Sequence, residues 1–240
     1  NAGILTKEFL RLHIIELAAS FQVMALSFGL AYRYNGLKKE KEALEIESSE
    51  ARQSLFAIRR ELKVAQQIHS SLLPSSAPEI PGLEISFVYA PCGSLGGDFL
   101  DFSVRTDHEV ELIIADVTGH GLAAALFASA VRMAYKAEAQ KKSNNPAQIL
   151  QNMNRVLFQQ LGGNFLSAAI LRVDALEQHA FFSDAGPPPL LLQRRGSGGE
   201  ILSFKPPGTL LGIFPEIVTE NAGISLKPGD RIILYSDGLT

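Results

Sequence analysis

Three aspartates lie at the edges of apolar runs, each within three residues of a glycine, in a pattern that could gather carboxylates at one site. Asp116 begins the stretch Asp116-Val117-Thr118-Gly119-His120-Gly121, which follows the β-rich run 110–115. Asp98 lies in Gly96-Gly97-Asp98, and Asp237 lies in Ser236-Asp237-Gly238. The run 110–115 predicts a buried strand, and the alanine-rich run 122–128 predicts a helix. A carboxylate between a strand end and a glycine turn would lie at the floor of a pocket.

If Asp98, Asp116 and Asp237 converge, their charges require compensation. Like charges within a few ångströms raise one another's pKa, so three carboxylates stay ionised together only around a cation. Oxygen ligands suit Mg²⁺ or Mn²⁺, and a pair of such ions about 3.5–4 Å apart activates water for displacement at phosphorus. The three aspartates could also belong to three separate turns. Their spacing alone leaves both a shared metal site and separate turns open.

The glycines after Asp116 also match a dinucleotide-binding pattern. Gly119-x-Gly121-x-x-Ala124 fits G-x-G-x-x-G/A between a strand and a helix. That motif expects an acidic residue about 20 positions later, where this chain has Gln140 followed by two lysines. Asp116 would also repel a pyrophosphate in the turn. The sequence therefore disfavours a dinucleotide site.

Length and composition limit the domain organisation and the classes of partner that this chain can have. The chain has 240 residues with 46% hydrophobic content and 14 Phe, enough for one large domain and an appendage. A net charge of −3 argues against nucleic acid as the main partner. The single cysteine, Cys92, excludes an intramolecular disulfide and a four-cysteine zinc site, and it fits a reducing cytosol. Because the sequence opens without Met, we expect it to be part of a longer protein.

Residues 12–34 predict a transmembrane helix. As a helix this stretch would span roughly 34 Å, against a hydrocarbon core of about 30 Å. The basic residues that follow it, from Arg33 to Lys41, suit the cytoplasmic side. Glu16 and Gln22 are costly at membrane depth, so an ordinary amphipathic or buried helix remains the alternative.

Residues 35–73 predict a coiled-coil signalling linker that forms a homodimer. Apolar residues recur every seven positions, and Leu55 and Leu62 fill intervening positions of the same stripe. The recurring residues are Leu37, Leu44, Ala51, Ile58, Ala65 and Leu72. A single helix packed on its own domain is the alternative. Pro74 ends the helix.

Residues 74–240 predict a globular α+β domain. Strands are expected at 83–89, 98–104 and 110–117, followed by helices at 121–140 and from Asn145 to about Leu161. Further strands are expected at 165–173, 179–183, 190–193, 217–224 and 231–235. Strands, then two consecutive helices, then strands again is an α+β order and not an alternating βαβ order.

The ordered motifs resemble those of the SpoIIE/RsbU branch of the metal-dependent type 2C protein phosphatases. The matching stretches are Gly96-Gly97-Asp98-x-x-Asp101, the stretch from Asp116 to Gly121, and Tyr235-Ser236-Asp237-Gly238. Gln67-x-x-x-Ser71-Leu72-Leu73-Pro74 and Leu210-Leu211-Gly212 are also similar to family segments. The resemblance implies an αββα sandwich, with two antiparallel sheets between helix pairs.

The resemblance also implies a site and a reaction. Asp98, Asp116 and Asp237 would be the catalytic metal ligands, with Asp116 bridging two Mn²⁺ or Mg²⁺ ions and the Val117 carbonyl beside it. The expected reaction removes phosphate from phosphoserine or phosphothreonine of a protein, often an anti-sigma-factor antagonist in a partner-switching pathway. The competing class is a non-catalytic partner-binding module on the same fold.

Two family features differ or fall outside the sequence. The family usually reads Ala-Gly-His-Pro-Pro-Pro where this chain has Ala185-Gly186-Pro187-Pro188-Pro189, so a histidine is missing at a place that shapes the pocket rim. A late metal-binding Asp-Asp-x-Thr motif is expected beyond residue 240.

Residues 27–33 resemble the last span of seven-transmembrane receptors with diverse intracellular signalling modules. This implies a location at the inner membrane, with the phosphatase domain in the cytoplasm.

Overall fold

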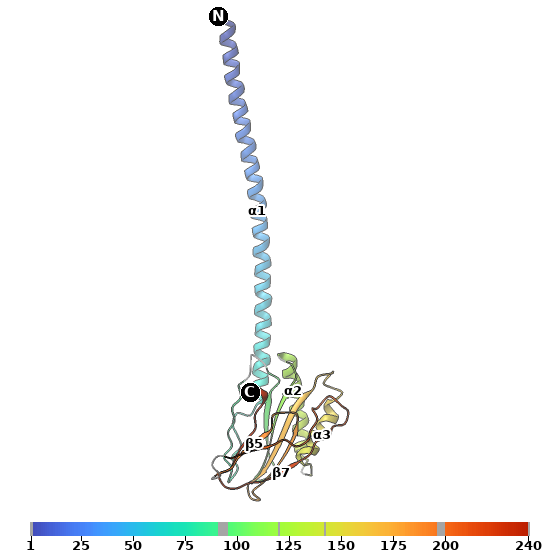
Figure 1. Ribbon diagram of the computed structural model, residues 1–240. Coiled ribbons are helices and arrows are strands. Elements are labelled where there is room, and N and C mark those ends of the chain that lie inside the picture. Colours follow the sequence, from blue (N-terminus) through green and yellow to red (C-terminus); the bar gives the residue numbers. More distant parts are fainter. Residues whose placement is uncertain (1, 91–95, 120, 142, 196–199, 240) are drawn as a thin grey trace. The chain divides into compact units, whose positions relative to one another are not determined.

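The computed structural model describes residues 2–90, 96–119, 121–141, 143–195 and 200–239. The chain divides into two units, residues 1–60 and residues 61–240. Helix α1 (Ala2–Leu72) makes up the first unit and continues into the second (Figure 1).

The N-terminal part of α1 does not support the predicted membrane span over residues 12–34. Within the described residues, no helix is both long enough and apolar enough to cross a membrane. Glu16 and Gln22 interrupt the stretch and Arg33 lies at its end, and such groups are costly in hydrocarbon. The helix itself is present as expected.

The helical linker over residues 35–73 is confirmed as a helix, which ends at Leu72 just before Pro74. Ion pairs one turn apart, Lys38–Glu42 at 3.9 Å and Lys41–Glu45 at 3.6 Å, line its surface. The apolar stripe is open to solvent in this chain, with Leu37 66% and Ile58 52% exposed. Its pairing with a second helix stays a prediction.

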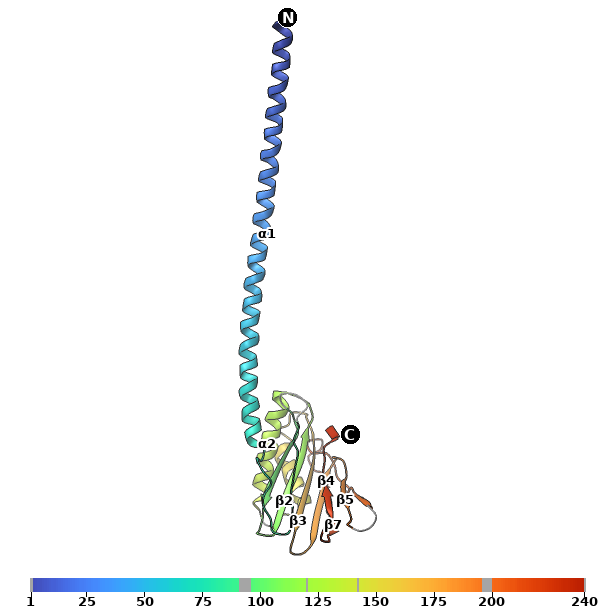
Figure 2. The same cartoon turned by 90° about the vertical axis from the view of Figure 1, so that its left-hand side faces the viewer.

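The second unit contains two antiparallel sheets. The first has the order β1-β2-β3-β4-β7 and the second has the order β6-β5-β8 (Figure 2). Sheet one comprises β1 (Phe99–Val104), β2 (Glu109–Val117), β3 (Leu166–Asp174), β4 (His179–Ala185) and β7 (Ala222–Ser225). Sheet two comprises β5 (Leu190–Gln193), β6 (Ile201–Phe204) and β8 (Arg231–Ile233), followed by the short 3-10 helix η1 (Asp237–Leu239).

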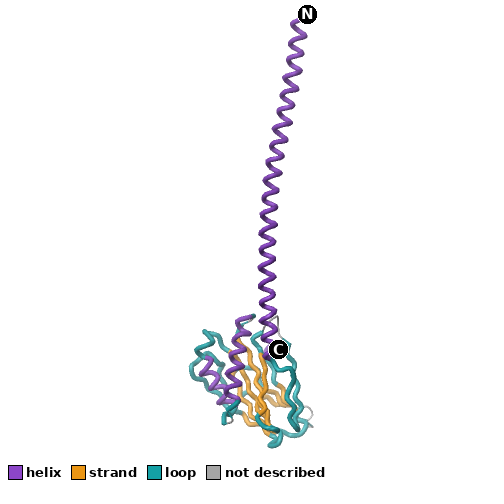
Figure 3. Tube along the Cα trace, turned by 180° about the vertical axis from the view of Figure 1, so that it is seen from behind, coloured by secondary structure: helices purple, strands orange, loops and turns teal. Residues whose placement is uncertain are grey.

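Two helices lie along one face of sheet one, α2 (Leu122–Ala139) and α3 (Pro146–Leu157) (Figure 3). Alanine and leucine favour α2. A capping box starts α3, because the Asn145 side chain accepts from the Gln148 backbone N–H while the Gln148 side chain accepts from the Asn145 N–H. Pro146 suits the first helical position, where no intrahelical N–H donor is needed.

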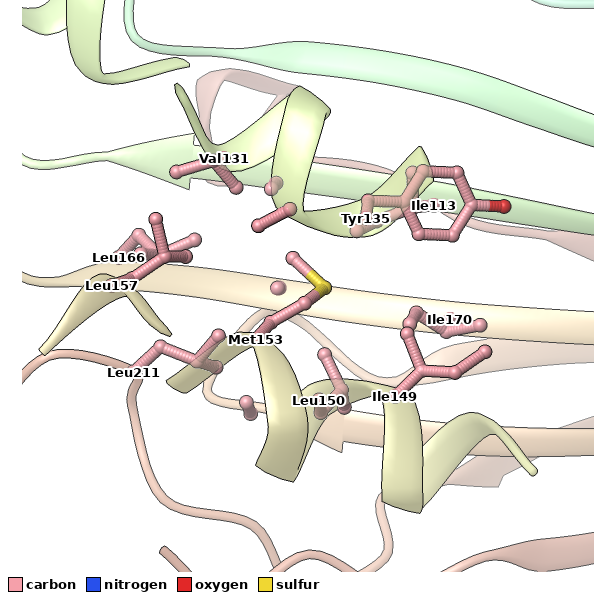
Figure 4. Packing of buried hydrophobic residues seen from close by; sticks show 14 of the residues in the cluster. Ile113, Val131, Tyr135, Ile149, Leu150, Met153, Leu157, Leu166, Ile170 and Leu211 are labelled. Atoms are coloured by element: carbon pink, nitrogen blue, oxygen red, sulfur yellow. The ribbon is translucent and has the colours of Figure 1, made fainter. Parts of the chain in front are cut away.

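Strand alternation divides the core into two clusters. On β2, Ile113, Ala115 and Val117 pack toward α2 and α3, where Met153 and Leu150 meet them (Figure 4). The intervening side chains contribute to a second cluster that joins the two sheets, including Val110, Ala169, Leu171, Phe182, Leu190 and Leu192. A side-chain period of two explains why one strand serves both clusters.

The structure departs from the predicted elements in four places. Residues 83–89 are extended and alternate in burial, but only Leu83 forms an isolated bridge, to Ile80. The predicted strand 217–224 is reduced to β7, and β6 was not predicted. In the described part of the chain, α2 and α3 are the helices that cover a sheet, so the second helix pair of the expected αββα sandwich is not seen there. The two antiparallel sheets are confirmed.

Candidate metal centre

Strand register brings two of the predicted ligands face to face. Strands β1 and β2 are antiparallel, and their first paired residues are Phe99 and Ala115. One further step places Asp98 directly opposite Asp116. Such partners have Cβ atoms about 4.5–5.5 Å apart. Asp116 shares its face of β2 with Ile114, which packs against the cluster between the sheets. The pair therefore lies at the edge of the sandwich.

Gly97 allows this close approach. Its carbonyl accepts a hydrogen bond from the Val117 N–H at 3.3 Å. A Cβ at position 97 would lie 2.3 Å from the Val117 carbonyl oxygen, closer than van der Waals contact permits. The glycine before Asp98 therefore keeps β1 against the carbonyl that the sequence predicts as a ligand. The Tyr89 hydroxyl also donates to the Asp98 carbonyl at 3.1 Å.

Two glycines turn the chain from β2 into α2. Gly119 and Gly121 have φ angles of 103° and 81°, a region that other residues rarely adopt. Between β2 and these glycines, Thr118 anchors the turn to the segment before β3. Its N–H and hydroxyl both donate to the Phe165 carbonyl, at 3.0 and 2.9 Å, and its hydroxyl accepts from the Phe165 N–H at 3.2 Å. His120 of the same motif lies outside the described residues.

Electrostatic coupling joins all three aspartates. Burial, followed by the charges of Asp98 and Asp237, raises the pKa of Asp116 to about 6. The pKa of Asp98 is also raised, mainly by burial and further by the Asp237 charge. Hydrogen bonds with Asp116 and Ser236 lower it, but they offset only part of this rise. Asp237, at the start of η1, is therefore in range of the β1–β2 pair.

This carboxylate cluster fits a hard divalent cation in donor type and in charge. Asp98 Oδ1 is buried and accepts no hydrogen bond within the described part of the chain, so it is an oxygen acceptor left for a cation. In that same part, however, no three acidic, histidine or cysteine side chains are arranged tightly enough to hold a metal ion. The ligand roles of Asp98, Asp116, Asp237 and the Val117 carbonyl therefore stay predictions.

Asp101 supports the site, although the sequence analysis assigned no role to it. It is buried, with 4% exposure, and its carboxylate lies 2.6 Å from Arg132 Nε and 3.0 Å from Lys136 Nζ. These cations are one helical turn apart on α2. The second aspartate of Gly96-Gly97-Asp98-x-x-Asp101 therefore fastens β1 to α2. The i, i+4 basic pair is the sequence signal that could have suggested this role.

The loop that lacks the family histidine lies at the same edge. Extending the β3–β4 register by one residue places Gly186 opposite Ser167, and Ser167 pairs with Asp116. The Asp184 side chain holds this loop, because its Oδ1 accepts from the Gly186 N–H at 2.9 Å. Burial raises the pKa of Asp184. This loop is therefore two strands from Asp116, at the same edge of the sheet.

With this geometry in view, comparison with known proteins settles the family. A family model described as stage II sporulation protein E (SpoIIE) matches residues 106–240. The chain belongs to the SpoIIE family.

Two relatives of this SpoIIE-family chain carry phosphatase names. Phosphoserine phosphatase RsbU of Bacillus subtilis is 27% identical over 184 residues, which cover 76% of this chain and 54% of the relative. Phosphoserine phosphatase RsbP of the same organism is 25% identical over 186 residues, covering 75% and 45%. The chain thus spans about half the length of these relatives.

A solved structure confirms the fold. The SiaA-PP2C domain of Pseudomonas aeruginosa superimposes with a TM-score of 0.62 at 22% identity, covering 75% of this chain and 71% of that one. At this identity the likeness concerns the fold alone. The mixed arrangement of helices and two antiparallel sheets is therefore that of the PP2C class.

Proposed function

We propose that this protein removes phosphate from phosphoserine or phosphothreonine side chains of a protein by metal-dependent hydrolysis. The observation that carries the proposal is the opposition of Asp98 and Asp116 across the β1–β2 ladder, with Asp237 in electrostatic range of both. Membership of the SpoIIE family and the names of the RsbU and RsbP relatives support the same reaction.

In this proposal each part of the centre has a separate task. Asp98, Asp116, Asp237 and the Val117 carbonyl would hold two Mn²⁺ or Mg²⁺ ions, with Asp116 as the shared ligand. When bound, such ions would lower the pKa of a water molecule and stabilise negative charge at phosphorus. Gly97 keeps the Val117 carbonyl beside Asp98. The bonds of Thr118 and Asp101 fix the two strand ends against their neighbours, so that the carboxylates are preorganised.

Phosphate release from a phosphoprotein tests the proposal. The full-length protein should release phosphate in the presence of Mn²⁺, lose this activity after EDTA treatment, and recover it when Mn²⁺ is added back. Repeating the recovery with Mg²⁺ compares the two ions. Release that survives thorough chelation would contradict the metal dependence. Binding of the phosphoprotein without any release under all these conditions would instead favour the non-catalytic binding module.

The proposed substrate is a phosphorylated anti-sigma-factor antagonist of a partner-switching pathway. The family resemblance of the motifs supports this assignment. Purified candidate antagonists from the same organism, phosphorylated on serine or threonine, can be compared in the release assay. The expected substrate loses its phosphate at least tenfold faster than unrelated phosphoproteins.

We further propose that the protein acts as a homodimer joined through α1. The exposed apolar stripe along residues 37–72 supports this arrangement, since a coiled coil would cover it. The inner-membrane location expected from the sequence stays a prediction, and fractionation of cells that express the full-length protein would test it.

A further inference from the structure

An open apolar pocket of about 440 Å³ lies beyond the α3 helix, outside the carboxylate cluster. It is lined by Phe158, Phe165 and Ile213, together with Gly163 and Gly212. Phe165 and Ile213 are 39% and 40% exposed. None of the lining residues carries a charge. Such a pocket favours an apolar side chain over a charged one.

Hydrogen bonds from the neighbouring core hold the walls of this pocket in place. The buried Asn154 side chain donates to the Phe214 and Pro215 carbonyls at 2.9 and 3.1 Å and accepts from the Gly212 N–H at 2.8 Å. Leu166 and Leu211 exchange two backbone hydrogen bonds, both 3.0 Å, and their side chains join the core (Figure 4). The pocket is therefore preformed, so an entering side chain does not have to order it.

The pocket is connected to the segment after Asp116 through Phe165. Phe165 carries three hydrogen bonds to Thr118, which lies two residues after Asp116. Two residues along a strand and one strand across amount to roughly 8–12 Å. An extended peptide covers that distance in about three or four residues. A protein segment with its phosphorylated residue at the cluster can therefore reach the pocket.

We propose that this pocket binds an apolar side chain of the phosphoprotein substrate, about three or four residues from the phosphorylated serine or threonine. The inference rests on the proposed phosphatase function and adds a sequence preference to it. The occupant is a residue of the size of leucine, isoleucine or phenylalanine. Phe165 and Ile213 are then specificity-determining residues, because they contact the substrate away from the reacting phosphorus.

A series of phosphoserine peptides tests the preference. The peptides share a glycine–serine background and carry a single leucine at each position from −4 to +4. With the full-length protein, leucine at a position three or four residues from the phosphoserine should raise kcat/KM about tenfold, mainly through a lower KM, because it leaves water for an apolar pocket. Hydrolysis of p-nitrophenyl phosphate, which has no flanking residues, reports on the centre separately.

Substitution of the pocket wall links the preference to this site. Ile213→Ser and Phe165→Ser should each reduce the leucine preference to less than twofold. Ile201→Ser on β6, with 58% exposure, and Phe181→Ser on β4, with 45% exposure, are matched controls and should keep it. Circular dichroism confirms that each variant is folded.

The outcomes separate this inference from the proposed function. If the wild-type protein hydrolyses neither p-nitrophenyl phosphate nor any peptide, the proposed function fails. If it hydrolyses them without a positional preference, or if both wall variants keep the preference, the pocket inference is wrong while the phosphatase assignment stands.

Discussion

Asp116 carries a charge that its surroundings disfavour. Burial and the neighbouring carboxylates of Asp98 and Asp237 raise its pKa to about 6. Without a cation, the folded domain therefore retains, between about pH 4 and pH 6, a proton that the unfolded chain, with a pKa of about 3.9, would release. A carboxylate is expensive to keep ionised beside two others. A divalent cation removes that cost. This cost of ionisation is consistent with the proposed metal centre.

Asp116→Asn should abolish phosphate release while the domain stays folded. The amide keeps the shape of the carboxylate but removes the charge that would bridge two ions. We expect less than a tenth of wild-type turnover on a phosphoprotein with Mn²⁺, and an unchanged far-ultraviolet circular dichroism spectrum. Asp107→Asn, in the exposed β1–β2 turn, is the matched control and should keep full activity. Turnover above a tenth of wild type would remove the bridging role from Asp116.

Gly97→Ala should damage both the fold and the metal centre. The added methyl group would meet the Val117 carbonyl oxygen at 2.3 Å, and the three nearest atoms all belong to the Val117 backbone, so no flexible side chain can give way. Overpacking of this kind costs about 1–3 kcal/mol, and moving the carbonyl should weaken Mn²⁺ binding. Urea unfolding and Mn²⁺ titration measure the two effects. Gly36→Ala, where nothing lies within 4 Å, should cost no stability; equal effects at the two glycines would contradict the role of the close contact.

At the scale of elements, β8 is connected to the rest of sheet two through the turn that precedes it. Asp230 in this turn accepts hydrogen bonds from Arg194 and from the backbone N–H groups of Arg195 and Lys227. Burial alone would raise the pKa of Asp230, but these hydrogen bonds lower it below its ordinary value. Because β8 leads directly to η1, this turn also supports the segment that carries Asp237.

Asp230→Asn should therefore destabilise the domain in a pH-dependent way. The native carboxylate, with its depressed pKa, stabilises the fold above the unfolded pKa of about 3.9. That contribution is lost as the pH falls through the folded value. We expect a deficit of about 1–2 kcal/mol at pH 7 that narrows below about pH 4, measured by urea unfolding with circular dichroism. As a control, Glu216→Gln at an exposed position should not lower the free energy of unfolding at either pH. If the deficit of Asp230→Asn did not narrow in acid, charge-assisted hydrogen bonds would not be its cause.

Helix α1 carries a stripe whose burial requires a partner. Replacing Ile58 and Leu62 with Asp should leave the soluble part of the protein monomeric, because pairing would then bury unpaired charge. The double variant should also show an altered Mn²⁺ requirement, since α1 leads through Pro74 into the domain that holds Asp98. Light scattering and the phosphate release assay measure the two effects. Replacing Gln53 and Arg60, which lie off the stripe, with Asp should change neither. A double variant that stays dimeric, or that becomes monomeric with an unchanged metal response, would contradict the proposal.

For the molecule as a whole, metal binding should raise the stability of the folded state. A ligand that binds only the folded state contributes about 2.7 kcal/mol at 100 times its Kd. For a domain of this size we expect the thermal midpoint to rise by about 5–10 °C in saturating Mn²⁺. The Asp116→Asn variant should lose most of this rise, as followed by calorimetry without any substrate. An equal rise in both proteins would place the bound ion elsewhere.

Much of the local structure could be predicted from the sequence. The strands around Ile113 and Ile170, the alanine-rich α2 and the capped start of α3 are set by alternation, propensity and end signals within a few residues. The family motifs likewise identified Asp98, Asp116 and Asp237 as the candidate ligands. Residues 83–89 have the same alternating pattern as a strand, but they pack on the core without joining a ladder. The alternation of apolar and polar residues indicates which side chains are buried. It does not indicate which backbone groups form hydrogen bonds with a neighbouring strand.

The tertiary structure decided how the three aspartates relate to one another. Asp98 faces Asp116 because of the β1–β2 register, and Asp237 comes into range because the chain returns through β8 more than a hundred residues later. The pocket beside Phe165 depends in the same way on Asn154, which connects α3 to the loop after Gly212. The burial that raises the pKa of Asp116 is also a property of the folded domain. Residue types and local elements follow from short-range interactions, whereas charge coupling and pocket walls follow from contacts between segments that only folding brings together.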